Sequence, residues 1–254
     1  MFFAFAQRSF LAVVVLSAAF ALCSPEAKSA TPAQSSESSE QRSPAEWSDA
    51  VQKRYAQLDN MHVLFEQKIT HGESGITEER QGEIHFRKPF LVRWITRPPA
   101  EEVLVVTDKL IWQYLPDEEL AYKFPIEAVD DKNAFLRVLF GMSSLSSSFE
   151  ITVLSDKDVP GKPDAEAGQG EADALVCLQL DPFEPSTSLM QAIIWVEPDS
   201  ATLRRLQITD FYGNVSEMSV TSLEVNVKIP DSTFEFSPPP GTEIEDQTQL
   251  PDGL

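Results

Sequence analysis

The chain is poor in cysteine and in basic residues, and each shortage excludes a class of protein. Only 2 of the 254 residues are cysteine, Cys23 and Cys177, so a small disulfide-stapled fold is excluded. Lysine and arginine total 20 against 40 acidic residues, a net charge of −20. Nucleic acids and anionic membrane surfaces select basic patches, so neither is an expected partner. The fold must therefore depend on its own hydrophobic core.

Sequence motifs that signal catalysis or metal binding are also missing. The chain has no HExxH, CxxC, GxSxG or Walker loop, and its carboxylates are scattered. Its histidines, His62, His71 and His85, lack metal-site spacing, and we expect them to face solvent. Cys177 lies in the apolar stretch ALVCLQL, which predicts a buried, unreactive thiol. The sequence thus predicts no enzyme, no catalytic residue, no metal and no cofactor.

Long hydrophobic runs are absent beyond the N-terminus. Arg8 precedes an apolar run over 10–22 that is too short to span a bilayer and is typical of a secretory signal. Ala19-Phe20-Ala21 offers a small-x-small cleavage site, so we predict a signal peptide over 1–23 and export from the cytoplasm. The alternative is a lipoprotein signal that leaves a lipidated Cys23.

The remaining chain divides by composition. Residues 24–43, rich in Ser, Glu, Pro and Gln, predict a disordered leader. We expect one folded domain over 44–245, a flexible tail over 246–254 and an exposed acidic loop over 155–173.

A helix and a series of strands follow the leader. Ser43-Pro44-Ala45-Glu46 is typical of a capping box with proline at the first helical position, which predicts a helix over 44–59. Short connections favour antiparallel pairing, so about eleven strands predict a mainly β fold, either a large barrel or a strongly curved sheet. The predicted strands cover 61–69, 81–87, 90–97, 102–107, 110–115, 120–124, 148–155, 174–181, 188–197, 203–210 and 214–226, with a short one at 233–237.

Large apolar residues concentrate between 82 and 124. In the first two strands of this stretch they fall on even positions and therefore share one face: Ile84, Phe86, Phe90, Val92 and Trp94. The next two strands, 102–107 and 110–115, are apolar in both phases. Two interpretations stay open here, a core that packs on both faces and a hydrophobic cavity that receives a guest.

A second apolar segment interrupts the strands. Between Asp131, a possible N-cap, and Gly141, a possible C-cap, Arg137 is the one polar residue of the stretch 134–140. A helix that is apolar nearly all round must be covered on more than one side. We therefore predict that this helix closes over the proposed cavity.

Several motifs occur in an order that resembles one family. They are Phe65-Glu66-Gln67, the stretch 82–94 (GEIHFRKPFLVRW), Ile111-Trp112-Gln113-Tyr114-Leu115-Pro116, Asp210-Phe211-Tyr212-Gly213-Asn214 and the ending 234–242 (FEFSPPPGT). Over about residues 45–245 the chain is similar to LolA, the periplasmic outer-membrane lipoprotein carrier family.

The resemblance implies an unclosed, half-open antiparallel barrel with an N-terminal helix and a helical lid over a cavity for lipoprotein acyl chains. It implies a monomeric periplasmic chaperone that accepts cargo from the transporter LolCDE and passes it to the receptor LolB. The ligand-binding residues would be Phe65, Phe86, Phe90, Val92, Trp94, Trp112, Tyr114 and, in the lid, Phe135, Leu136, Leu139 and Phe140. Lys88 stands where the family has a lid-locking arginine, and Arg87 precedes it.

Three other functions stay open. A LolB-like receptor would share the fold but be anchored through a lipidated Cys23. An RseB-like sensor would bind protein as well as lipid. A lipid esterase would need a nucleophile motif that the sequence lacks.

Overall fold

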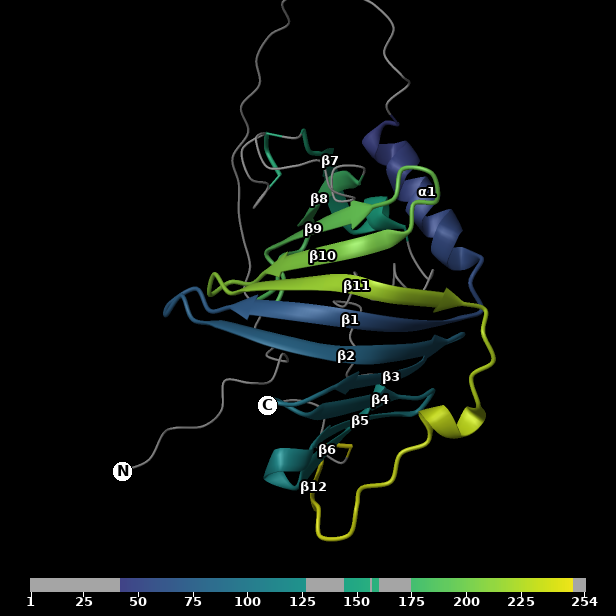
Figure 1. Cartoon of the computed structure of the whole chain (residues 1–254), viewed down its shortest axis with the longest axis vertical. Helices are drawn as coiled ribbons and strands as arrows, with labels where there is room; N and C mark the ends of the chain where they lie inside the picture. Colours follow the sequence, from purple (N-terminus) through teal and green to yellow (C-terminus); the bar gives the residue numbers. More distant parts are fainter. Residues whose placement is uncertain (1–41, 127–143, 156, 160–174, 249–254) are drawn as a thin grey trace, which may run out of the picture.

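A computed structural model describes residues 42–126, 144–155, 157–159 and 175–248. One sheet dominates the described chain, with the strand order β12-β6-β5-β4-β3-β2-β1-β11-β10-β9-β8-β7 (Figure 1). Its elements are α1 (Pro44–Ala56), β1 (Asn60–Thr70), β2 (Thr77–Arg87), β3 (Leu91–Thr96), β4 (Glu102–Val106), β5 (Leu110–Leu115), η1 (Pro116–Glu118), β6 (Leu120–Pro125), η3 (Leu145–Ser147), β7 (Phe149–Val153), β8 (Val176–Pro182), β9 (Gln191–Val196), β10 (Leu203–Thr209), β11 (Val215–Val225), η5 (Asp231–Phe234) and β12 (Glu243–Asp246).

This architecture confirms the predicted fold class. The fold is mainly β, its ladders are antiparallel except β12 with β6, and the sheet does not close, since β12 and β7 stand at opposite ends of the order. Eleven of the predicted strands are present, but the prediction of a short strand at 233–237 is wrong. That region holds the 3-10 helix η5, and the strand β12 follows it. Among the described residues no helix has the length and apolar content to cross a membrane.

Helix α1 begins as its capping box predicts. The Ser43 N–H donates to the Glu46 carboxylate at 2.7 Å, and the Glu46 N–H donates back to Ser43 Oγ at 3.4 Å. These two bonds satisfy donors that the first turn of a helix leaves free. The helix ends three residues earlier than predicted, at Ala56, where Lys88 Nζ donates to the Ala56 carbonyl at 2.6 Å. A cation at this end also favours the helix dipole.

The two faces of the sheet differ in what covers them. The core face carries the alternating buried residues of every central strand, for example Val63, Phe86, Val92, Val106 and Ile194. Helix α1 packs on this face at the β7–β10 end (Figure 1). There the Tyr55 hydroxyl accepts a hydrogen bond from the Leu203 N–H at 3.1 Å, and Ser48 Oγ accepts one from the Ser146 N–H at 2.9 Å. The opposite, outer face holds a smaller buried cluster of Cys177, Ile193 and Trp195.

The segment DFYGN forms the turn between β10 and β11. The Asp210 carboxylate accepts hydrogen bonds from the backbone N–H groups of Tyr212 at 2.8 Å and Asn214 at 2.9 Å. Gly213 has a φ of +74°, which other residues adopt at a steric cost. Asn214 Oδ1 also accepts from the Gly72 N–H at 3.0 Å, so this turn is tied to the β1–β2 turn. The motif therefore has a structural role.

The segment that follows β11, residues 226–246, crosses the outer face, and we call it the C-terminal strap. It leaves β11, passes η5 and reaches the far edge of the sheet, where β12 pairs with β6 (Figure 1). Arg93 Nη1 donates to the Thr233 and Glu235 carbonyls at 3.3 and 3.2 Å. Arg87 forms an ion pair with Asp231 at 2.6 Å. The strap thus covers the outer face of β2–β6.

Candidate functional site

The core face of strands β2–β6, together with the turn between β2 and β3, carries large apolar side chains that are only half-buried. We call them the open apolar face: Ile84, Phe90, Trp94, Leu104 and Phe124. Direct pairing of Ile84 with Trp94 and of Trp94 with Leu104 places these residues side by side on neighbouring strands. Helix α1 makes its main contacts with η3 and β7 at the other end of this face, and its last residue, Ala56, reaches this half through Lys88. The arrangement suits an apolar guest.

An aromatic pair anchors the middle of this face. The rings of Phe65 and Trp94 meet edge to face with centroids 5.2 Å apart. Gly82 lies beneath Phe65, and a Cβ atom at this position would stand 2.7 Å from the ring and 2.1 Å from the Ile95 carbonyl oxygen. Glycine is therefore required for the ring and strand β3 to approach. Trp94 Nε1 donates to Thr96 Oγ1 at 3.2 Å, so its one polar atom is satisfied.

Five of the predicted ligand residues do share the core face. Phe65, Phe86 and Val92 are almost fully buried, at 1%, 1% and 5% exposure, so they form the floor of this face. Phe90 and Trp94 are half-buried and are the better placed to touch a guest. Binding of a ligand by these residues stays a prediction.

Two predicted ligand residues require a correction. Trp112 and Tyr114 lie on the outer face, where their rings pack on Phe236 of the C-terminal strap with centroid distances of 5.6 and 5.7 Å. Strand β5 carries apolar side chains on both faces of the sheet because the strap, and not a ligand, covers its outer face. The sequence interpretation missed this because it assigned 233–237 to a strand of the sheet.

The predicted lid residues Phe135, Leu136, Leu139 and Phe140 lie outside the described residues. The two residues proposed to secure the lid, Lys88 and Arg87, have other contacts in the structure. Lys88 holds the end of α1, and Arg87 binds the strap through Asp231 and stacks over Phe234 at 4.9 Å. The role of Lys88 and Arg87 in securing a lid stays a prediction.

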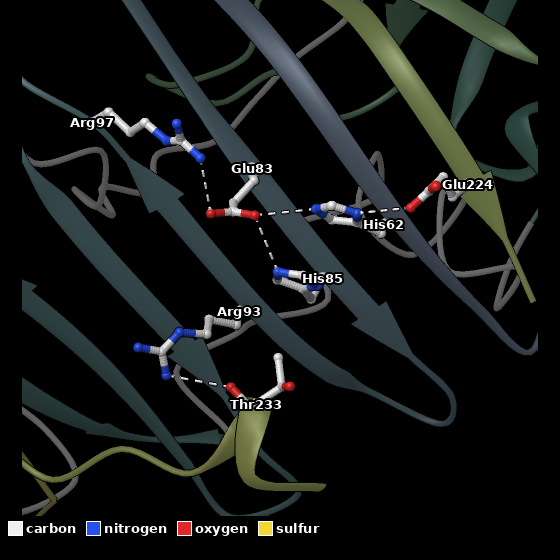
Figure 2. A network of polar contacts seen from close by, with 7 residues as sticks. All are labelled: His62, Glu83, His85, Arg93, Arg97, Glu224 and Thr233. Atoms are coloured by element: carbon white, nitrogen blue, oxygen red, sulfur yellow. Dashed lines mark hydrogen bonds and ion pairs between the residues drawn. The ribbon is translucent and has the colours of Figure 1, made fainter. Parts of the chain in front are cut away.

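A polar network occupies the outer face at the centre of the sheet (Figure 2). His62 of β1 lies between Glu83 of β2 and Glu224 of β11, at 3.1 and 3.2 Å, and His85 lies 3.4 Å from Glu83. Arg97 also reaches Glu83, at 3.3 Å. We expected solvent-facing histidines, but the side chains of His62 and His85 are only 23% and 20% exposed. The missing signal was the strand register, which pairs His62 directly with His85.

Protonation within this network follows its surroundings. Burial, and then the nearby charge of His62, lower the pKa of His85 below its ordinary value. Burial acts to raise the pKa of Glu83, but hydrogen bonds from His62 and Arg97 and the charge of His85 outweigh it, and the net pKa is lowered. Glu83 is therefore a carboxylate at neutral pH.

Two further features bear on chemistry. Cys177 is 4% exposed between Ile193 and Trp195, which confirms the predicted buried thiol. A cavity of about 530 Å³ is lined mainly by polar groups, including Glu66, Lys68, Arg205 and Glu217, and does not suit a hydrocarbon chain. The open apolar face is therefore the better candidate for binding, which favours the class of proteins that bind apolar ligands.

The comparisons with known proteins agree with this class. The model of the family described as "Outer membrane lipoprotein carrier protein LolA" matches residues 56–161 and 162–237. An outer-membrane lipoprotein carrier protein of Sodalis glossinidius is 28% identical over 205 residues, covering 81% of this chain and 90% of that protein. The carrier of Cronobacter sakazakii is 26% identical, covering 79% and 89%. The chain therefore belongs to the LolA family of outer-membrane lipoprotein carrier proteins.

Solved structures support the fold. An uncharacterised conserved protein from Thermus thermophilus superposes with a TM-score of 0.50 and 12% sequence identity, covering 80% of this chain and 98% of that one. At this identity the similarity concerns the fold alone.

Proposed function

We propose that this protein carries lipoproteins through the periplasm by sheltering their acyl chains on the open apolar face. The observation that supports the proposal is the row of half-buried apolar side chains, Ile84, Phe90, Trp94, Leu104 and Phe124, which lie away from the main contacts of α1 with η3 and β7. The names of the curated relatives, outer-membrane lipoprotein carrier proteins, agree with it. Cleavage of the signal peptide over 1–23 would release the chain into this compartment.

The energetics require such a face. Burial of one methylene is worth about 0.8 kcal/mol, so one acyl chain of about sixteen carbons gains on the order of 10 kcal/mol on leaving water. A carrier must also release its cargo, and an apolar segment that competes for the same face would lower the net affinity. The sequence offers Phe135, Leu136, Leu139 and Phe140 for that segment. In this proposal LolCDE loads the carrier and LolB, where present, unloads it, with no nucleotide hydrolysis by the carrier.

The test compares two neighbouring residues on opposite faces of β3. Trp94 lies on the core face and Ile95 on the outer face, and both are half-buried. A photoreactive phenylalanine analogue at each position, in protein loaded with lipoprotein released from spheroplasts, would be illuminated and probed for covalent adducts. We expect adducts from position 94 and none from position 95.

A functional assay completes the test. Phe90→Glu places a charge on the open apolar face and should abolish release of lipoprotein from spheroplasts. Ile76→Glu, at a residue 62% exposed in the turn between β1 and β2, should release as the unaltered protein does. Equal crosslinking from both positions, or normal release by Phe90→Glu, would contradict the proposal.

A further inference from the structure

The polar network on the outer face has the donor set of a metal site. On one face of a strand, residues i and i+2 are neighbours, and the directly paired residue of the next strand lies beside them. Glu83 and His85 of β2 have this spacing, and His62 of β1 is paired with His85. One Glu83 oxygen faces the Nε2 atoms of both histidines (Figure 2). All three side chains keep about a fifth of their surface exposed, so an ion can reach them.

The distances fit a tetrahedral ion. Bonds of about 2.0–2.1 Å to nitrogen and oxygen imply ligand atoms about 3.3–3.4 Å apart in a tetrahedron. Glu83 Oε2 lies 3.1 Å from His62 Nε2 and 3.4 Å from His85 Nε2, and the three candidate ligand atoms all lie within 4.8 Å of one another. We propose that His62, Glu83 and His85 form a binding site for a divalent transition-metal ion, with zinc as the ion that suits it best.

The surrounding groups orient two of the three ligands, His62 and Glu83, as metal sites require. A metal-bound imidazole usually donates its second N–H to a carboxylate, which fixes the tautomer and the ring. Glu224 stands 3.2 Å from His62 Nδ1 in this position, and pairing of His62 with Glu224 across β1 and β11 fixes it there. Arg97 donates to the second Glu83 oxygen at 3.3 Å, which leaves Oε2 for the ion. His85 Nδ1 is buried and has no hydrogen-bond partner among the described residues.

Charge and donor type define the class of ion. Two imidazoles and one carboxylate favour zinc, copper or nickel, whereas magnesium and calcium prefer oxygen ligands only. The two carboxylates of Glu83 and Glu224 balance a dication, and Arg97 opposes it. Arg93, the next residue in the cross-strand row, is engaged by the strap through the Thr233 and Glu235 carbonyls. Three protein ligands leave a fourth position for water or an outside ligand.

Binding requires one local rearrangement. The rings of His62 and His85 are stacked, with centroids 4.3 Å apart and planes only 2° apart. Two stacked rings cannot both direct their lone pairs at one ion, so the rings must tilt about the Cβ–Cγ bond. This torsion has a broad energy minimum, so the tilt is accessible. We therefore expect micromolar affinity and a lower affinity than a preformed site would have.

The experiment uses the mature chain, with any affinity tag removed, and zinc as the probe. Isothermal titration and competition with a chromogenic chelator should give one zinc per chain, and an excess of magnesium should not displace it. His85→Gln and Glu83→Gln should each weaken binding at least tenfold, and Glu224→Gln about tenfold, the range typical of outer-shell partners. His71→Gln is the matched control, because His71 pairs with Glu78 away from the network, and it should bind as the unaltered chain does.

A second measurement needs no variant and so does not depend on whether a variant folds. In nitrogen-15 spectra of the unaltered chain, zinc should shift the ring nitrogens of His62 and His85 and leave those of His71 in place. Zinc at a hundredfold excess over Kd should also raise Tm by about 5 °C or more. Absence of binding up to 100 µM zinc, undiminished affinity of the folded His85→Gln variant or shifts confined to His71 would overturn the proposal. The result of the zinc titration does not change the expected crosslinking from position 94, so the proposed metal site and the proposed lipoprotein binding can be refuted independently.

Discussion

Replacement of Gly82 by alanine tests the packing at the centre of the open apolar face. The new Cβ would lie 2.1 Å from the Ile95 carbonyl oxygen and 2.7 Å from the Phe65 ring, both well inside contact distance. Either β2 and β3 must separate or the Phe65 ring must turn away from Trp94. Overpacking of this kind costs about 1–3 kcal/mol or more, and the lower chain entropy of alanine returns about 0.5–1 kcal/mol. Because one of the clashes is with backbone, we expect a net loss of about 2–3 kcal/mol.

The assay is urea unfolding followed by tryptophan fluorescence, with the slope m checked for two-state behaviour. The expected loss corresponds to a fall in Tm of about 5–10 °C for a domain of this size. Gly75→Asn is the control, because Gly75 has a φ of +67° that asparagine tolerates and a Cβ there meets nothing within 4 Å. It should change the free energy of unfolding by less than about 0.5 kcal/mol. A Gly82→Ala variant as stable as the unaltered chain would refute the described approach of Phe65 to β3.

Three further predictions concern the fold. Burial raises the pKa of Tyr55 to about 12, so the folded state holds its proton more tightly than the unfolded state, and stability is complete below pH 10 and declines as pH rises through 12. The free energy of unfolding should fall by on the order of 2–3 kcal/mol over this range, and the fall should be absent in Tyr55→Phe. That variant should instead lose about 1–2 kcal/mol at neutral pH, because the Leu203 N–H loses its acceptor. The same dependence of stability on alkaline pH in both proteins would contradict this. Cys177 should react with a thiol reagent only after unfolding, as followed by absorbance, and rapid labelling of the native chain would disprove its burial. Truncation after Thr242 removes β12 and exposes the edge of β6, so the shortened chain should self-associate in size-exclusion chromatography, and a clean monomer would count against this protective role.

Local patterns were sufficient to predict most of the fold. The alternation of Ile84, Phe86, Val92 and Trp94 placed them on one face, which the register of β2 and β3 confirms. The helix start at Ser43 was predictable because a capping box is a local signal. Antiparallel pairing of consecutive strands was predictable because short connections favour it, whereas the pairing of β1 with β11 joins distant segments of the chain.

Features that depend on long-range pairing were not predictable in this way. The stacking of His62 on His85 needs the relative register of two strands, which a one-residue shift would change completely. Likewise, the parallel pairing of β12 with β6 joins segments more than a hundred residues apart in the chain. The packing of Trp112 and Tyr114 on the outer face was missed for the same reason, because their partner Phe236 comes from the distant strap.

The C-terminal strap has a mechanical consequence for the half of the sheet that holds the open apolar face. It is fastened to β2 through Arg87, to β3 through Arg93, to β5 through Phe236 and to β6 through β12. Because the strap is attached to four strands, it limits how far these strands can move apart. The strap, which lies on the outer face, would thereby limit how much room the opposite, open apolar face can offer to the proposed ligand.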